Sequence, residues 1–261
     1  MAINMFCVVP GEYRWIPIGL SIVVLGWVIA GYLPQLSCVP HAYVAFCFGT
    51  AVTVPVGGDQ VAQNLALLLV PVCVTWRGRW HWASDTSNTI GIRELVAWCA
   101  VALVMVQASV IYAVSFISKL AVTEWVDGTV IYYWFQDQIF GPAGWGGDVL
   151  RALSFQPIGT AVLTFGTLAL EAGLAVAIFV RGRARAGLLI AGIAFHGAIA
   201  LTMGLISFGL AMTALLLLYL GDLGPQPRTW PFYVWRTPTA TLRSTRDESP
   251  ALLSPSTQQP R

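Results

Sequence analysis

Residues 94–118 read ELVAWCAVALVMVQASVIYAVSFIS, and no charged side chain interrupts the run after Glu94. A helix that crosses the hydrocarbon core of a bilayer needs about 20 predominantly apolar residues. This run is long enough, and Lys119 follows it directly. We therefore predict a transmembrane helix that ends in the only lysine of the chain.

Further apolar runs of similar length lie on both sides of this helix. The predicted spans are residues 15–33, 60–76, 94–118, 157–180, 186–203 and 205–221. The last two are separated by Met203-Gly204-Leu205, which is either a tight turn or a kink in one long helix. The predicted fold is an all-α, polytopic membrane helical bundle with about six transmembrane helices, or five if the last two form one.

The composition excludes a soluble globular protein. Of 261 residues, 57% are hydrophobic and 10% are charged, whereas soluble domains carry about 25% charged residues. We expect a cytoplasmic N-terminus over 1–14, one membrane domain over 15–221, and a cytoplasmic, disordered tail over 222–261, which is rich in Pro, Ser, Thr and Arg. A net charge of +2 without a basic motif does not indicate nucleic-acid binding.

The distribution of basic residues predicts an orientation in the membrane. Six spans with a cytoplasmic N-terminus leave only Lys119 and Arg151 on the outer side. The basic residues expected on the cytoplasmic side are Arg14, Arg77, Arg79, Arg93, the three arginines of 181–185 and those of the tail. Short cytoplasmic loops carry an excess of Lys and Arg. Both termini are therefore predicted to be cytoplasmic.

Two segments are expected to form outer loops, 34–58 and 119–156. The second is rich in tryptophan and acidic residues. Cys38 and Cys47 share the first loop, where they either form a disulfide or remain two buried thiols. None of the cysteine spacings is typical of a zinc site, so we expect no metal.

Two ionisable residues, Glu171 and His196, lie inside predicted spans. Such groups cost about 2.5–3.5 kcal/mol on insertion scales and indicate functional sites. Counted at 1.5 Å per residue from the arginine-rich turn between their helices, both lie about 15 Å deep. We therefore predict a Glu171–His196 hydrogen bond. It is either a structural clamp between two helices or part of a proton path or a contact with a lipid headgroup.

Lys119 has two interpretations. A lysine at a helix end can extend its amine to water at the membrane surface. It can also be a general base, since lysine changes its protonation state readily when buried. Its uniqueness, its place on the outer side and the tryptophan-rich acidic segment that follows favour the second interpretation.

A cluster of polar residues opens the second predicted span on the same side as Lys119. It consists of Asp59, Gln60, Gln63 and Asn64. Asp59 either caps its helix or pairs with Lys119 across the bundle. Since three amides are more than a cap requires, we interpret the cluster as the wall of a polar cavity.

Several motifs resemble known families. Tyr112–Leu120 ends in Lys-Leu and is followed by Glu124-Trp-Val-Asp-Gly128, which resembles the vitamin K-dependent γ-carboxylases and their bacterial relatives, the HTTM superfamily. Phe195-His196 with the later Gly204-Leu-Ile-Ser-Phe208 resembles the His-bearing helix of that superfamily. Gly57-Gly-Asp-Gln60 and Arg79-Trp-His-Trp82 are similar to its sporulation-delaying protein B branch.

The resemblance implies a quinone-dependent enzyme that matures a secreted peptide. It assigns Lys119 as the base that deprotonates reduced vitamin K or menaquinone, with O2 as co-substrate, and places Trp125 and Asp127 beside it. It further implies a small SdpA-like partner protein, a secreted, Cys-containing peptide precursor, a bacterial plasma membrane and a site that faces outward. The carboxylases have a large lumenal domain and a second lysine where this chain has Ser118, so carboxylation itself is not implied.

Two other functions remain open from the sequence. The chain could be a non-enzymatic scaffold, an exporter or an immunity protein for a peptide toxin, with Lys119 in a structural ion pair. It could also be a peptidase, but the sequence contains no His-Glu-x-x-His motif, and its three histidines are scattered.

Overall fold

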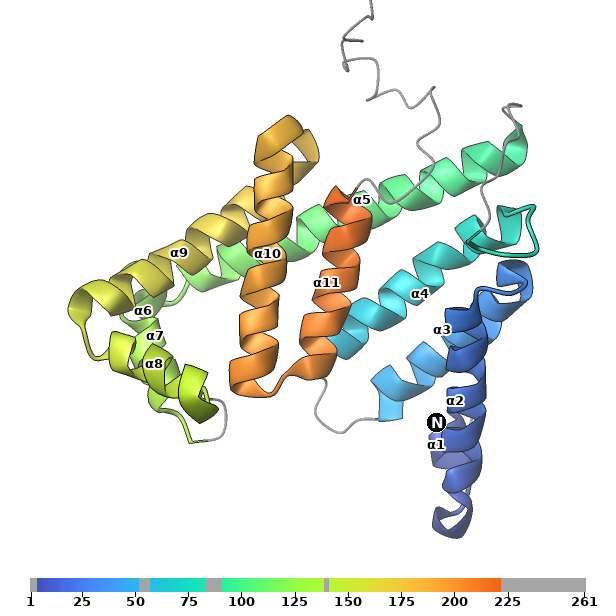
Figure 1. Cartoon of the computed structure of the whole chain (residues 1–261), viewed down its shortest axis with the longest axis horizontal. Coiled ribbons are helices and arrows are strands. Elements are labelled where there is room, and N and C mark those ends of the chain that lie inside the picture. The colour runs from blue at the N-terminus through green and yellow to red at the C-terminus, as the bar shows by residue number, and fades with distance from the viewer. Residues whose placement is uncertain (1–3, 52–56, 83–90, 139–140, 222–261) are drawn as a thin grey trace, which may run out of the picture. The chain divides into compact units, whose positions relative to one another are not determined.

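The computed structural model describes residues 4–51, 57–82, 91–138 and 141–221. The regular elements in these segments are all helices (Figure 1), with one isolated bridge between Tyr32 and Trp80. The prediction of an all-α fold is therefore confirmed.

Five helical segments are long and apolar enough to cross a membrane. They are Gly11–Ala30, α4 (Gly57–Thr75), α5 (Ile92–Leu120), α9 (Pro157–Ala175) and α10 (Gly182–Met203). The first consists of a short 3-10 turn, Gly11–Tyr13, and α2 (Trp15–Ala30). A shorter apolar helix, α11 (Ile206–Leu220), completes the predicted set. The chain is a polytopic membrane protein.

The last two predicted spans are separate helices. Gly204 has φ +72°, a left-handed conformation that suits glycine and ends a helix. The chain reverses there, so that α11 packs against α10. At Gly209, an added Cβ would lie 2.6 Å from Cβ of Ala200 and 2.9 Å from the His196 carbonyl oxygen. This close approach requires glycine, and it excludes the single kinked helix.

The segment 34–58 is not an outer loop, because most of it forms α3 (Pro34–Ala51). This helix packs against α4 along its length. The prediction of a loop over most of this segment is therefore wrong. Pro34 is the first residue of the helix, where a missing N–H costs nothing, and Pro40 lies in its interior.

The possible disulfide between Cys38 and Cys47 is not formed, and both are free, buried thiols. Nine positions in one helix separate them by about 13.5 Å along the axis. A disulfide requires Cα atoms within about 7 Å. The helical conformation of α3 therefore selects the second alternative, two buried thiols.

The turn between α2 and α3 lies beside the C-terminal end of α4. Gly31 accepts a backbone hydrogen bond from His81 at 2.7 Å, and Leu33 donates one to Arg79 at 2.7 Å. Arg14 precedes α2 and so lies at the far end of that helix from Arg79. The structure thus separates two arginines that the sequence grouped on one side. The orientation of the termini relative to the membrane stays a prediction.

The segment 119–156 contains three short helices: α6 (Thr123–Val126), α7 (Val130–Gln136) and α8 (Gly144–Ser154). Arg151 holds the α7–α8 connection, because its guanidinium donates to the carbonyl oxygens of Pro142 (2.7 Å) and Phe135 (3.3 Å). The Ala143 amide donates to Thr202 at the end of α10 at 2.6 Å. These helices form an ordered cap beyond the end of α5.

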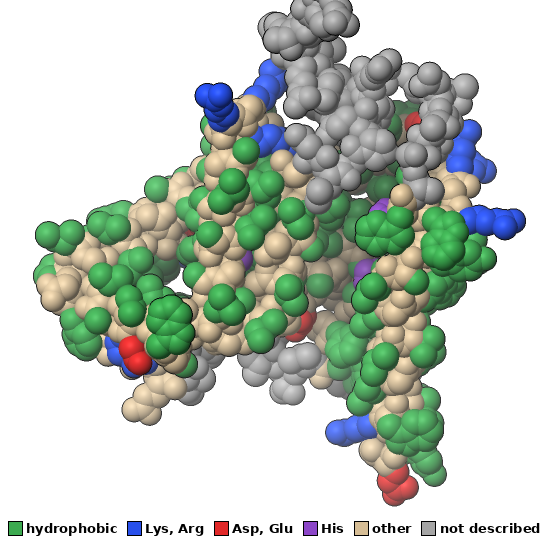
Figure 2. Space-filling model, viewed as in Figure 1, with side chains coloured by type: hydrophobic (Ala, Val, Ile, Leu, Met, Phe, Trp, Pro, Cys, Tyr) green, Lys and Arg blue, Asp and Glu red, His purple; other side chains and the backbone are tan. Residues whose placement is uncertain are grey.

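The buried core and the outer surface are both apolar. A cluster that includes Val104, Leu215 and Tyr219 packs where α4, α5 and α11 meet. Figure 2 shows hydrophobic side chains spread over the outward faces of the helices, with basic side chains near helix ends. Ile158 and Leu201 are 80% and 85% exposed. Apolar surfaces of this kind are typical of helices that face lipid.

Candidate functional site

One face of α5 carries the polar residues of the site. Tyr112, Ser115 and Lys119 follow the i, i+3, i+7 spacing that aligns side chains along a helix. This face is directed at α9 and α10, since each of the three side chains has a partner there. The aligned spacing therefore concentrates polar groups at a meeting point of three apolar helices.

The amine of Lys119 is turned into the protein. Its Nζ donates to Glu171 Oε1 at 2.8 Å, to Ser115 Oγ at 2.6 Å and to the Ser115 carbonyl oxygen at 3.5 Å. The side chains of Lys119 and Glu171 are 21% and 8% exposed. The ring centroid of Trp125 lies 5.3 Å from Nζ, within the range of a cation–π contact. This geometry contradicts an amine extended to the membrane surface.

Glu171 is only partly satisfied by these contacts. Its Oε1 accepts from Lys119 and also from the Ser115 hydroxyl at 3.0 Å. Its Oε2 is buried and has no hydrogen-bond partner. A buried acceptor without a donor is costly, so each such atom in a native protein calls for an explanation.

His196 pairs with Tyr112 and not, as predicted, with Glu171. The Tyr112 hydroxyl lies 3.0 Å from Nε2 of His196, and both residues are buried. The prediction placed Glu171 and His196 at the same depth on two antiparallel helices, α9 and α10. Figure 1 shows instead that α5 and α9 run obliquely to α10 and α11. Glu171 therefore meets α5 at Ser115 and Lys119, and His196 meets it at Tyr112, about one to two turns earlier.

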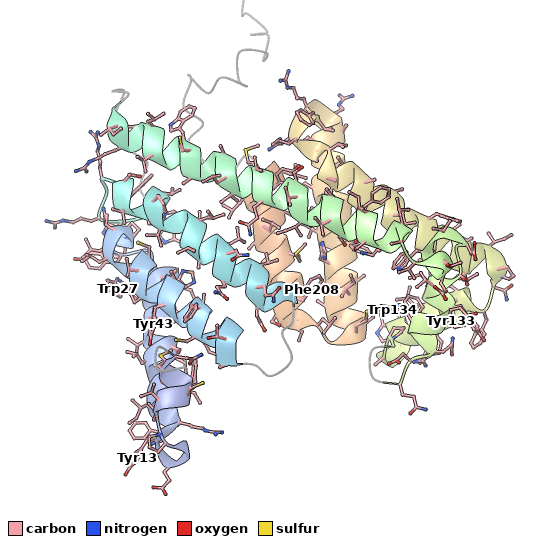
Figure 3. All side chains as sticks on the ribbon, turned by 180° about the vertical axis from the view of Figure 1, so that it is seen from behind. Tyr13, Trp27, Tyr43, Tyr133, Trp134 and Phe208 are labelled. Atoms are coloured by element: carbon pink, nitrogen blue, oxygen red, sulfur yellow. The ribbon has the colours of Figure 1, made fainter. Side chains whose placement is uncertain are left out.

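Aromatic rings surround His196. The ring of Phe208 packs edge-on against it at a centroid distance of 5.5 Å. Phe208 also closes the gap to α4, because a Cβ at Gly58 would lie 2.4 Å from its Cα. Figure 3 labels Phe208 near the first turn of α4. The Gly204–Phe208 motif thus positions an aromatic ring against His196, whose Nδ1 is buried without a partner.

The turn after α5 positions Trp125. Gly128 has φ +76°, and a Cβ there would lie 2.7 Å from the Phe165 ring. This glycine lets the chain fold back over α9 and hold Trp125 near Lys119. Asp127 follows α6 and is exposed. Of the two predicted site residues in this turn, only Trp125 contacts the amine.

The polar cluster of α4 lies elsewhere. Asp59 lines a cavity of about 210 Å³ between α2, α3 and α4, together with Leu25, His41, Val44, Ala45, Phe48 and Ala62. Gln63 lies close to Gly49 of α3, whereas Gln60 and Asn64 are exposed. Of the four predicted residues only Asp59 lines this cavity, whose other walls are mostly apolar, and Lys119 pairs with Glu171 and not with Asp59.

Tyr112 and Ser115 were not among the predicted site residues. Their signal was the helical spacing from Lys119, which places them on its face of α5. In the part of the chain that the structure describes, no group of three His, Cys, Asp or Glu side chains could hold a metal ion.

Sequence comparison relates this chain to a protein of Bacillus subtilis (strain 168). It is 30% identical over 230 residues to the uncharacterized protein YitO, an alignment that covers 84% of this chain and 72% of YitO. The chain belongs to the YitO family. The sporulation-delaying protein SdpB of the same organism is also a member, at 30% identity over 202 residues.

The alignment with SdpB covers 77% of this chain and 62% of SdpB, so the chain spans less than two thirds of that relative. No protein-family model matches the chain, and neither does any solved structure. The predicted relation to sporulation-delaying protein B is confirmed at the level of the YitO family. The wider relation to the γ-carboxylases stays a prediction.

Proposed function

We propose that this member of the YitO family is the membrane component of an enzyme that modifies a secreted peptide with the help of a hydroquinone and O2. The observation that carries the proposal is the Lys119–Glu171 pair, buried between two membrane helices and bridged by Ser115. Ionisable groups at such positions are costly and mark functional sites. The relation to SdpB supports a role in a peptide-toxin system.

The unpaired atoms of the site suit a hydroquinone. Such a molecule has a flat apolar ring and two hydroxyl groups that can donate or accept, and the site offers two buried polar atoms without partners, the acceptor Glu171 Oε2 and the ring nitrogen His196 Nδ1. Trp125 and Phe208 offer aromatic faces beside them. When bound, a hydroquinone supplies the electrons for reduction of O2. The γ-carboxylase resemblance supports vitamin K or menaquinone as its class.

The residues of the chain have separate tasks in this proposal. The hydrogen-bonded group of Lys119, Ser115 and Glu171 receives a proton, and the Tyr112 hydroxyl contacts His196. The helices α6 to α8 limit the access of water from the end of α5. Proton-transferring side chains placed in this way contribute about 10²–10⁴-fold to a rate.

The partners are a small SdpA-like protein and the peptide precursor. The cap of α7 and α8 exposes several aromatic side chains, and Figure 3 labels two of them, Tyr133 and Trp134. Trp145 of α8 is 87% exposed. Aromatic side chains are favoured at protein interfaces, so we assign this cap as the face that receives the partner or the peptide.

The test compares two neighbouring substitutions in cells that make the secreted peptide. Lys119→Ala removes the amine, and Ser118→Ala changes an exposed hydroxyl that bonds only within α5. We expect Lys119→Ala to abolish the modification, read as the peptide's mass, while the protein still accumulates. Ser118→Ala should leave that mass unchanged. An unchanged mass with Lys119→Ala refutes the proposal.

One observation favours a second candidate, a non-enzymatic scaffold. An ammonium has three N–H donors, and all of those of Lys119 have acceptors in the protein, as in a structural clamp. The double substitution Lys119→Glu with Glu171→Lys keeps an ion pair between α5 and α9. A scaffold should retain its function in this variant, whereas the enzyme should lose it.

A further inference from the structure

The hydrogen bonds of Lys119 all use its amine as the donor. Every neighbour of Nζ is an acceptor: Ser115 Oγ, the Ser115 carbonyl oxygen and Glu171 Oε1. Three acceptors match the three N–H bonds of an ammonium, which has no acceptor capacity. In this arrangement Lys119 is a donor.

The free acceptor of the pair is on Glu171. Oε1 receives two hydrogen bonds, from Lys119 and Ser115, whereas Oε2 receives none and is buried. The residue as a whole is only 6% exposed. A buried carboxylate oxygen without a partner is free to accept a hydrogen bond or a proton from a molecule bound beside it.

On the basis of the function proposed above, we infer that Glu171 is the proton acceptor and that Lys119 acts as its permanent ammonium partner. In the step, the O–H bond of a donor hydroxyl breaks and an Oε2–H bond forms. Glu171 becomes neutral, and the donor oxygen gains one negative charge. The ammonium of Lys119, which is no longer balanced by Glu171, then balances that charge.

The arrangement suits a low-dielectric site. Before the step, the site holds one positive and one negative charge, and afterwards it holds the same two charges at different atoms. A neutral lysine acting alone as base would instead create a new pair of charges inside the membrane, which is costly where water does not solvate them. Ser115 holds Lys119 and Glu171 side by side, because its hydroxyl accepts a hydrogen bond from Lys119 and donates one to Glu171.

Substitutions separate the two roles. Glu171→Gln keeps the size and an oxygen acceptor for Nζ but removes the carboxylate, and we expect at least a 100-fold loss of modified peptide. Lys119→Arg keeps a positive charge that cannot act as a base, and we expect the modification to remain within about tenfold of wild type. Glu124→Gln, an exposed acid on α6, is the matched control and should change nothing.

The reactivity of the amine gives a second readout that does not depend on activity. Because Lys119 is the only lysine, Ser118→Lys adds an exposed reference amine beside it. We expect acetylation of the full-length Ser118→Lys protein in detergent, followed by mass mapping, to label the added lysine at least tenfold faster than Lys119. In the double variant Ser118→Lys with Glu171→Gln, most of this difference in acetylation rate should disappear.

The outcomes distinguish the inference from the proposed function. If Lys119→Ala leaves the peptide's mass unchanged, the proposed function itself fails. If Lys119→Ala abolishes the modification but Glu171→Gln retains it, only the assignment of Glu171 is overturned. The assignment of Glu171 is also overturned if Lys119→Arg accumulates normally but loses the peptide modification as completely as Lys119→Ala. Equal acetylation of residues 118 and 119 in Ser118→Lys overturns the ammonium state, whichever variants accumulate.

Discussion

Replacing Lys119 with methionine should destabilise the protein, because it leaves the Glu171 carboxylate buried without its counter-charge. Removing one partner of a buried ion pair costs about 3–5 kcal/mol. The Lys119 side chain retains 21% exposure, so we expect a value near the lower end, about 3 kcal/mol. At about 2–4 °C per kcal/mol for a chain of this size, the midpoint of thermal unfolding should fall by about 6–12 °C.

A second ion pair provides the control for this measurement. Arg77 and Glu94 pair at 2.9 Å, nearly the distance of Lys119 and Glu171, but their side chains are 44% and 25% exposed. Exposed pairs contribute about 0–1 kcal/mol. Arg77→Met should therefore lower the midpoint by no more than about 4 °C. The assay is thermal unfolding of the purified variants in one detergent.

The double variant Lys119→Met with Glu171→Leu completes the test. Replacing a whole buried ion pair by apolar residues is often neutral or stabilising, so the double variant should recover most of the loss caused by Lys119→Met. If Lys119→Met unfolds at the temperature of the wild type, the amine extends to the surface and the buried pair does not form. That result would refute the reasoning.

Three further predictions concern packing and topology. Gly58→Ala would place a Cβ 2.4 Å from the α11 backbone, so we expect a loss of at least about 1–3 kcal/mol in unfolding experiments. Gly26→Ala, whose Cβ would meet no atom within 4 Å, should cause no loss. Tyr112→Phe leaves Nε2 of His196 without its partner. The free energy of unfolding should fall by about 1–3 kcal/mol, measured through the thermal midpoint. In a cysteine-free background, Arg14→Cys and Arg79→Cys should react with a membrane-impermeant maleimide from opposite sides; labelling from one side would contradict the path of α2.

Much of the fold was predictable from hydropathy alone. The runs that became α4, α5, α9, α10 and α11 are apolar over most of a membrane's thickness, and Gly204 marks the reversal between the last two. The α3 helix was not predictable in this way. Its prolines and His41 lower its apolar character, and packing on α4 stabilises the helix.

The site was predictable residue by residue but not as a set of pairs. Lys119, Glu171 and His196 each stand out as polar groups at the end or in the interior of apolar runs. Their partners depend on the angle at which α5 and α9 cross α10, and hydropathy contains no information about that angle. Asp59 was predicted to lie near Lys119, but it lines a cavity between α2, α3 and α4, and Lys119 pairs with Glu171.

The most direct test of the central claim is oxygen uptake by the purified chain reconstituted with the proposed partner and the proposed precursor peptide, started by a reduced naphthoquinone such as menadiol. The account predicts uptake above the rate of menadiol alone in wild type and Ser118→Ala, and none above that rate in Lys119→Ala. Equal uptake by wild type and Lys119→Ala would contradict it.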